Sequence, residues 1–312
     1  MMVTYNNSDG MKFLLLGITD NPDAQAPMFL IFLIMYLLTV LGNLIILIVI
    51  CVNPALHNPM YFFICNLSFL DISYSSVTQP KLLSILITGP NEISFNDCIG
   101  QLYVFMSLAC TEFVSLTAMA YDRYVAICKP LHYSVLMRKR VCLQMVIICW
   151  VVGFLDPLAH TVVISRLPFC KPLILNHFYC DLSLLLSLSC VDKFLIEIMT
   201  YIVGSVVALP AFLLTLVSYV FIISTILNIS SSSGRHKAFS TCTSHLTVVT
   251  LFYGTVLVMH MRPSSHYLLK QDKPLSVLYT AVIPMMNPLI YSFRNKDVKN
   301  ALRRLTNNKK YI

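Results

Sequence analysis

The residues with the clearest chemical potential are Asp122 and Arg123, two opposite charges side by side at the end of a long apolar run. A charge at the edge of a hydrocarbon layer is costly to bury, although a long side chain near a helix end can reach the lipid headgroups. The pair therefore predicts a functional site, and a plain topological anchor is the alternative.

A third charge, Glu112, lies eleven residues before Arg123, and no other charged residue falls between Asp97 and Asp122. Eleven residues make about three helical turns, or about 16 Å along a helix axis, so Glu112 and Arg123 share one helix face. We therefore expect one helix to carry a buried acid at mid-depth and an acid–base pair at its end.

The composition places this helix in a membrane. Of the 312 residues, 57% are hydrophobic and only 12% are charged, which is too apolar for a soluble domain of this length. The net charge of +8 does not indicate nucleic acid, because the basic residues gather at one end and in two short loops without interleaved aromatic residues. The expected surrounding is membrane lipid, and no nucleic-acid partner is expected.

Seven apolar runs are long enough to cross about 30 Å of hydrocarbon. Their approximate limits are 26–50, 59–86, 97–128, 141–165, 196–227, 238–261 and 273–293. The fourth is interrupted by Asp156 and Pro157, so a re-entrant segment is the alternative there. We expect an all-α membrane protein, with a seven-helix domain at 26–293, an extracellular tail at 1–25 and a cytoplasmic tail at 294–312.

The distribution of Lys and Arg predicts the orientation of the chain. With the N-terminus outside, fourteen of the 22 basic residues lie on the inner side and the other eight are spread thinly outside. The segment 293–305 alternates an apolar stripe with basic residues, which predicts a short amphipathic helix on the inner leaflet. In the outer tail, Asn6 begins an acceptor sequon for glycosylation. The apolar run at 12–18 is too short for a signal peptide.

Four of the eleven cysteines fall on the predicted outer side. Cys98 opens the third run, while Cys170, Cys180 and Cys190 lie between the fourth and fifth. An even set in an oxidising compartment predicts two disulfides, for which three pairings are possible. A weaker alternative is a metal site formed by ligands in the segment 177–181.

Several motifs resemble those of rhodopsin-like G-protein-coupled receptors. Asp122-Arg123-Tyr124 ends span three, and the segment 287–291, Asn-Pro-Leu-Ile-Tyr, ends span seven. Further matches are Gly42-Asn43, the segment 67–71 and Trp150. Four longer motifs resemble the signatures of odorant receptors of the terrestrial-type class: Pro-Met-Tyr-Phe-Phe at 59–63, Met-Ala-Tyr-Asp-Arg-Tyr-Val-Ala-Ile-Cys at 119–128, Lys-Ala-Phe-Ser-Thr-Cys-Thr-Ser-His-Leu at 237–246 and Pro-Met-Met-Asn-Pro-Leu-Ile-Tyr at 284–291. The resemblance covers the whole chain.

This resemblance implies a receptor that is not an enzyme. It would bind a small neutral volatile odorant between the outer helix halves and activate a stimulatory-type heterotrimeric G protein. The expected location is the plasma membrane of olfactory neuron cilia. By the same resemblance, Cys98 pairs with Cys180 and Cys170 pairs with Cys190.

The resemblance also assigns a switch to the inner half of the bundle. Its residues are Asp122, Arg123, Tyr124, Tyr219, Asn287, Pro288 and Tyr291. Arg123 would be held by Asp122 at rest and released to the G protein when span six moves outward, with Tyr219 and Tyr291 stabilising the open form. At mid-membrane we expect Asn43, Asp71, Glu112 and Asn287 to converge. A sodium ion at Asp71 and Glu112 would act as a modulator, and a hydrogen-bonded cluster without an ion is the alternative. No other cofactor is expected.

The expected ligand pocket uses one face of span three, because Phe105, Met106, Ala109 and Cys110 are spaced to lie on a single stripe above Glu112. Positions carried over from the family are Val203, Val207, Tyr253, Val256, Leu257, His260 and Thr280. Nearly all are apolar, so burial of apolar surface would drive binding. Tyr253, His260 or Thr280 would donate a hydrogen bond to one ligand oxygen.

Other classes of membrane protein fit less well. A retinal photoreceptor is excluded, because span seven holds no Lys between Lys273 and Arg294. Amine receptors resemble one another in carrying an Asp in the outer half of span three, and an amine receptor is disfavoured because this chain has no acid there. A transporter can use intramembrane acids such as Asp71 and Glu112, but the two halves of the chain show no matching repeat. A membrane enzyme would need a nucleophile or metal constellation, and the apolar runs assemble none.

Overall fold

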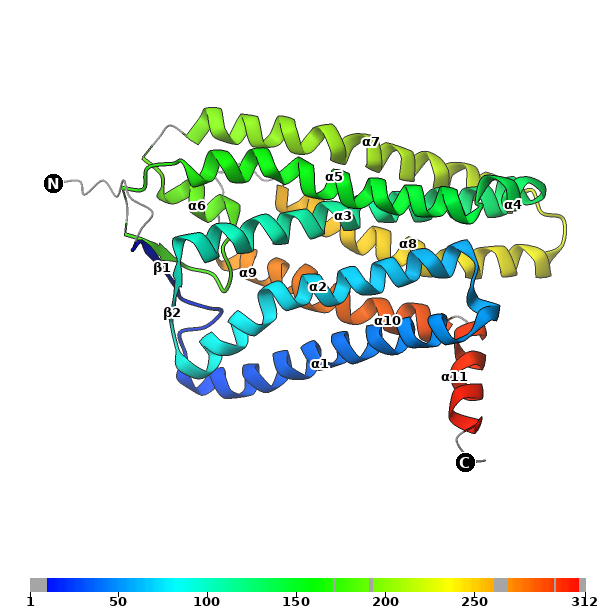
Figure 1. The fold of residues 1–312 in the computed structure, drawn as a ribbon, viewed down its shortest axis with the longest axis horizontal. Coiled ribbons are helices and arrows are strands. Elements are labelled where there is room, and N and C mark those ends of the chain that lie inside the picture. Colours follow the sequence, from blue (N-terminus) through cyan, green and yellow to red (C-terminus); the bar gives the residue numbers. More distant parts are fainter. Residues whose placement is uncertain (1–9, 171, 191–192, 261–268, 295, 309–312) are drawn as a thin grey trace.

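The structure is a computed structural model of the chain, and it describes all residues except 1–9, 171, 191–192, 261–268, 295 and 309–312. In the described part, long helices run side by side along the long axis of the molecule (Figure 1). They are α1 (Pro22–Val52), α2 (Pro59–Thr88), α3 (Phe95–Cys128), α5 (Lys139–Ser165), α7 (Lys193–Leu227) and α8 (Ser232–His260), followed by a segment made of α9 (Leu269–Val277), the π-helical η4 (Leu278–Val282) and α10 (Ile283–Arg294).

Short elements join and cover these helices. They are η1 (Pro54–Leu56), η2 (Pro130–His132), α4 (Tyr133–Leu136), α6 (Leu182–Leu188), α11 (Lys296–Asn308) and the strands β1 (Lys12–Leu15), β2 (Asn91–Ser94) and β3 (Ile174–Leu175). The strands and α6 lie at one end of the bundle, and α4 and α11 lie at the other (Figure 1).

Every predicted apolar run is helical over the residues that the structure describes, as expected. Within the described residues, four helices are long and apolar enough to cross a membrane: Pro22–Val52, Phe95–Cys128, Lys139–Ser165 and Ile198–Leu227. Helix α5 continues through Pro157 for 27 residues, which favours a full crossing over the re-entrant alternative. The chain is thus a bundle of apolar helices of the membrane type.

The starts of the first three long helices follow from local sequence signals. Asn21 caps α1 by accepting a hydrogen bond from the backbone N–H of Asp23, and Asn58 caps α2 through the N–H of Tyr61. A proline follows each of these two caps at the first helical turn, where its missing N–H costs nothing. Ser94 caps α3 in the same way.

Helix α3 lies at the centre of the bundle and packs against α2, α5, α7 and α8. Its most extensive contact is with α5, where Gly153 leaves room for the backbone and side chain of Thr111. A side chain at position 153 would overlap Thr111. Residues on α3 are therefore held by contacts on several sides, so this helix fixes the positions of the candidate site residues that it carries.

The N-terminal segment is more ordered than the predicted tail, and the fold is not purely α-helical. Strand β1 pairs antiparallel with β2 and parallel with β3, which gives a sheet in the order β2-β1-β3. Phe13 and Leu15 are fully buried, and the Phe13 ring packs edge-on against Phe169 with centroids 5.6 Å apart. The alternation of buried and exposed residues from Met11 to Leu15 is the period-two pattern of a strand. It was missed because the segment was considered only as a signal peptide.

The helix predicted after span seven is present as α11, which turns away from the bundle axis (Figure 1). Val298 and Ala301 are buried against the bundle, whereas Lys299 and Arg303 are exposed. Its two faces therefore have the predicted amphipathic character.

We expect Phe13→Ala to lower the free energy of unfolding by about 3–5 kcal/mol, because the change leaves a cavity between β1 and the outer loop. Thermal unfolding of the purified protein measures this. Ile174→Ala is the matched control, because Ile174 belongs to the same sheet but is 47% exposed, and it should cost below about 1 kcal/mol. Equal losses in the two variants would contradict a supporting role for the buried strand.

Candidate functional site

The C-terminal end of α3, which is predicted to be the inner end, holds its two charges as a buried pair. Arg123 forms a salt bridge with Asp122, and its Nε donates to Oδ2 of that carboxylate at 3.0 Å. The other carboxylate oxygen, Oδ1, accepts a hydrogen bond from the Tyr133 hydroxyl at 2.9 Å. Both charged side chains are at least nine-tenths buried. Asp122 thus holds Arg123 from one side and is itself held by α4.

Two other residues of the expected switch, Tyr219 and Tyr124, belong to one cluster with apolar residues at the same end of α3. Tyr219 on α7 forms a hydrogen bond with Nδ1 of His245 on α8, and both side chains are buried. Tyr124 is half-buried, and its ring lies 6.0 Å from that of Phe221. The Tyr291 side chain lies outside the described part of the chain. His245 was not singled out from the sequence, although it lies inside the motif at 237–246.

A second group of polar residues lies at mid-depth. Nδ2 of Asn287 donates to both carboxylate oxygens of Asp71, at 2.9 and 3.1 Å. Glu112 is buried and close enough to Asp71 for an electrostatic interaction. Asn43 is buried beside them but donates to the backbone carbonyls of Thr39 and Pro284, at 3.0 and 3.3 Å. Asp71, Asn287 and Glu112 therefore lie together, and Asn43 contacts the segment that carries Asn287 through the carbonyl of Pro284.

Three oxygens of this group have no hydrogen-bond partner among the described residues: Oδ1 of Asn43, Oε1 of Glu112 and Oδ1 of Asn287. Carboxylate and amide oxygens are ligands for hard cations, so the donor set fits a sodium ion.

Pro288, the residue after Asn287, lies so close to α1 that a side chain at Gly42 would approach its ring within 3.1 Å.

Two disulfides lie at the opposite end, which is predicted to be the outer end, and the pairings implied by the resemblance are confirmed. The segment between α5 and α7 is called the outer loop after this prediction. Cys98 pairs with Cys180, which fastens the outer loop to the start of α3, and Cys170 pairs with Cys190 within the loop. Because Cys180 is in a disulfide, the metal alternative for this loop is wrong. Among the described residues, no group of three or more His, Cys, Asp and Glu side chains is placed to hold a metal ion.

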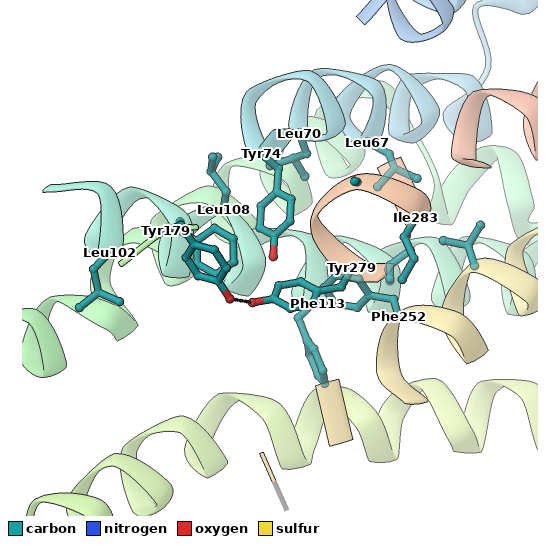
Figure 2. Close-up of a cluster of buried hydrophobic side chains, with 14 of the residues drawn as sticks. Leu67, Leu70, Tyr74, Leu102, Leu108, Phe113, Tyr179, Phe252, Tyr279 and Ile283 are labelled. Atoms are coloured by element: carbon teal, nitrogen blue, oxygen red, sulfur yellow. Dashed lines mark hydrogen bonds between the residues drawn. The ribbon is translucent and has the colours of Figure 1, made fainter. Parts of the chain in front are cut away.

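An aromatic cluster lies directly below this loop. The Phe105 ring, from the predicted ligand face of α3, lies 4.8 Å from the rings of both Tyr74 and Tyr179 and 5.7 Å from Tyr279. Figure 2 shows these three tyrosines, which come from α2, the outer loop and η4. We call Tyr74, Tyr179 and Tyr279 the outer tyrosine cluster. No local pattern predicts this cluster, because its members are distant in the chain.

His177 packs beside this cluster, and its Nε2 lies 3.2 Å from the Ser276 hydroxyl. Burial, together with the positive charge of Lys273, lowers the pKa of His177 to about 3. The imidazole is therefore neutral at physiological pH, and the outer loop presents an uncharged side chain to the cluster.

Most of the remaining predicted ligand residues are half-buried in the bundle. Met106, Ala109, Val203, Val207 and Val256 are half-buried, and Cys110 is half-buried with its thiol 3.9 Å from Oδ2 of Asp156 on α5. The Leu257 and His260 side chains lie outside the described part, as does the glycosylation candidate Asn6. No ligand contact is tested by this arrangement, so these assignments stay predictions.

The hydroxyls of Tyr253 and Thr280, which were expected to donate to a ligand oxygen, form hydrogen bonds within the protein instead. The Tyr253 hydroxyl donates to the carbonyl of Phe113 at 3.0 Å and lies 3.0 Å from Oγ1 of Thr117 and 3.3 Å from that of Thr215. Tyr253 thereby joins α3, α7 and α8. Thr280 donates to the Ser276 carbonyl at 2.6 Å. A ligand would have to compete with these bonds.

Comparison with known proteins identifies the class. The family model described as Olfactory receptor matches residues 32–309. Olfactory receptor 8U3 of Mus musculus is 49% identical over 97% of this chain and 95% of its own length, and Olfactory receptor 5A2 of Homo sapiens is 50% identical over 97% and 94%. Olfactory receptor 8H3 of Homo sapiens is 47% identical over 98% and 97%. The chain belongs to the olfactory receptor family, a non-enzymatic class of odorant-sensing G-protein-coupled receptors in membranes.

Proposed function

We propose that this receptor has seven membrane spans with its N-terminus outside, binds small neutral volatile molecules in the outer half of its bundle and activates a stimulatory-type heterotrimeric G protein. The observation that carries this proposal is the layout of α3. One helix is fastened to the outer loop at Cys98, holds Glu112 at mid-depth and ends at the Asp122–Arg123 pair. Ligand sensing and G-protein coupling would therefore occur at opposite ends of one element.

The seven-span topology is supported by the way the less apolar helices pack. Helix α2 buries Asp71, Ser75, Thr78 and Gln79 inside the bundle, so its low apolarity does not put polar groups against lipid. The helices α8 and α10 contact α3 and α2, respectively, and complete the ring. They would cross the membrane beside the four strongly apolar helices.

The orientation is supported by the chemistry of the two ends. The disulfide-bonded end fits an oxidising exterior. The opposite end carries exposed basic residues, among them Arg138, Lys139 and Arg235, as expected for the cytoplasmic side. There α11 would lie on the inner leaflet with its basic face toward anionic lipid. The cilia of olfactory neurons remain the proposed location.

The proposed switch follows from the buried inner pair. In the resting state Arg123 is bonded to Asp122, and α7 and α8 are joined through Tyr219 and His245. An outward movement of α8 would break the second contact and expose Arg123 to the G protein. An agonist can drive this change only by binding the open state more tightly than the closed one.

The mid-membrane group would supply a modulator site. A sodium ion would be held by the carboxylates of Asp71 and Glu112, assisted by the side-chain oxygens of Asn43 and Asn287. The ion offsets two negative charges that would be costly to bury unpaired. It would stabilise the resting arrangement of α2, α3 and α10. A hydrogen-bonded group without an ion is the competing interpretation.

Arg123→Ala is expected to abolish the agonist response while the protein still reaches the cell surface, because the lost contact is made mainly with the G protein. Surface labelling and a cyclic-nucleotide readout in the same cells measure both quantities. Arg140→Ala is the matched control, since Arg140 is an exposed basic residue at the same end, and it should respond normally. A response of wild-type size would contradict the switch, and loss of surface protein alone would support the topological anchor.

Replacing sodium with a large organic cation in the assay buffer should raise agonist potency in the wild-type protein but not in Glu112→Gln. The reason is that sodium favours the resting state and needs both carboxylates. Glu92→Gln, a change to an exposed acid in β2, should keep the wild-type sodium effect. If wild-type potency is the same in both buffers, no sodium ion regulates this receptor.

A further inference from the structure

The hydroxyls of the outer tyrosine cluster converge on one point. Those of Tyr179 and Tyr279 form a hydrogen bond with each other, and the Tyr74 hydroxyl points toward that pair (Figure 2). All three side chains are more than nine-tenths buried. An outer loop, α2 and the last helical segment thus each contribute one polar group to the same small region.

The Tyr74 hydroxyl is buried without a hydrogen-bond partner among the described residues. The Thr78 hydroxyl lies one helical turn further along the same face of α2, and it too is buried without a hydrogen-bond partner among the described residues. Buried hydroxyls in folded proteins are nearly always bonded, so an unbonded pair on one helix face needs an explanation. Packing of the aromatic ring alone does not supply one, because a phenylalanine would fill that position equally well.

The backbone around Tyr279 is also unusual. Tyr279 and Thr280 lie in η4, which is the only π-helical stretch in the described ranges of the chain. Single π-helical turns inside α-helices occur frequently at functional sites. Here the turn presents Tyr279 toward Tyr74 and Tyr179, so two independent features indicate the same location.

The carboxylates of Glu112 and Asp181 act electrostatically on the tyrosines of this region, but the polar groups of the region itself are uncharged. They are three phenols, the Ser276 hydroxyl, which accepts from Tyr179 at 3.4 Å, and the neutral imidazole of His177. The nearby cation, Lys273, donates to Oδ1 of Asn176 at 2.7 Å. Phenol hydroxyls donate well to a carbonyl, ether or alcohol oxygen. An anionic ligand would be repelled by the two nearby carboxylates, and a cationic ligand would lose its hydration without bonding to a charged group of the region itself, so the chemistry favours a neutral oxygen.

We propose that the outer tyrosine cluster is the subsite that recognises the oxygen of a ketone, ester or alcohol ligand. Tyr74 donates to that oxygen, and Tyr179 and Tyr279 separate enough to share it. The carbon skeleton then extends along Met106 and Ala109 on α3. This inference rests on the proposed odorant-binding function. It makes Tyr74 the first donor to the ligand oxygen in place of Tyr253 or Thr280, because, of these three hydroxyls, only that of Tyr74 is without a hydrogen-bond partner among the described residues.

The subsite also adjoins the mid-membrane group. Asp71 lies three residues before Tyr74 on α2, and Asn287 follows Tyr279 by eight residues in the last segment. The hydrogen bonds between Asp71 and Asn287 therefore join the two helical segments that supply two of the three tyrosines. A ligand that separates Tyr279 from Tyr179 acts directly on the segment that contains Asn287.

Tyr74→Phe is the sharpest test, because it removes a hydroxyl that bonds nothing in the ligand-free fold. The probe is the first ketone that activates the wild type in a panel of straight-chain ketones with about six to ten carbons, compared with the hydrocarbon in which a methylene replaces the carbonyl. The hydrocarbon is measured by competition against the ketone. Tyr103→Phe is the matched control: Tyr103 is a half-buried tyrosine of α3 whose hydroxyl donates to the Phe154 carbonyl, away from the cluster.

We expect Tyr74→Phe to weaken ketone potency by about tenfold, the size of one lost hydrogen bond. Affinity for the hydrocarbon, surface expression and the melting temperature without ligand should stay unchanged. Tyr179→Phe and Tyr279→Phe should show the same selective loss, and Tyr103→Phe should respond as the wild type does.

Three results would overturn the proposal. If Tyr74→Phe responds to the ketone with wild-type potency, the proposed odorant function stands and the subsite is wrong. An equal loss for ketone and hydrocarbon would show that the change disturbed packing and not oxygen recognition. If no ketone in the panel activates surface-expressed wild-type protein, ketone recognition is wrong; if a broader odorant panel is also inactive, the proposed function fails with it.

Discussion

The hydrogen bonds from Asn287 to Asp71 are the interaction on which the rest of the arrangement depends. A carboxylate in the middle of a bundle cannot be left without partners, because its desolvation is far too costly. Asn287 supplies both bonds from one amide group. It thereby fixes the last helical segment against α2 at a depth where water does not compete.

Other contacts around this pair bring further helices to the same place. Asn43 on α1 donates to the carbonyl of Pro284, one turn before Asn287, and Gly42 lets Pro288 approach α1 closely. Glu112 adds α3 from the opposite side. Four helical segments thus meet at one polar centre, with the disulfide-bonded loop and outer tyrosine cluster on one side and the Asp122–Arg123 pair on the other. A shift of the segment that contains Asn287 would therefore change contacts both at the outer tyrosine cluster and toward the Asp122–Arg123 pair.

The parts of this account that the sequence predicted are those with a strong local or motif signal. Apolar runs long enough for a membrane located the helices, and family motifs supplied the cysteine pairing. The strand at Lys12–Leu15 was missed because four residues carry little periodic signal and were compared with a signal peptide. Tyr74, Tyr179 and Tyr279 could not be grouped, since any two of them are at least 100 residues apart in the sequence and nothing local marks their contact. The bonded state of the Tyr253 hydroxyl likewise depends on helices that meet only in the fold.

The measurement that tests the central claim most directly is a double-mutant cycle across the polar centre. The free energy of unfolding is compared for the wild type, Asp71→Asn, Asn287→Asp and the double variant, which restores one carboxylate facing one amide. If the Asp71–Asn287 bonds hold the segments together, each single change destabilises the protein and the double variant recovers stability, with a coupling of about 1–3 kcal/mol. A double variant whose loss equals the sum of the two single losses would contradict the account.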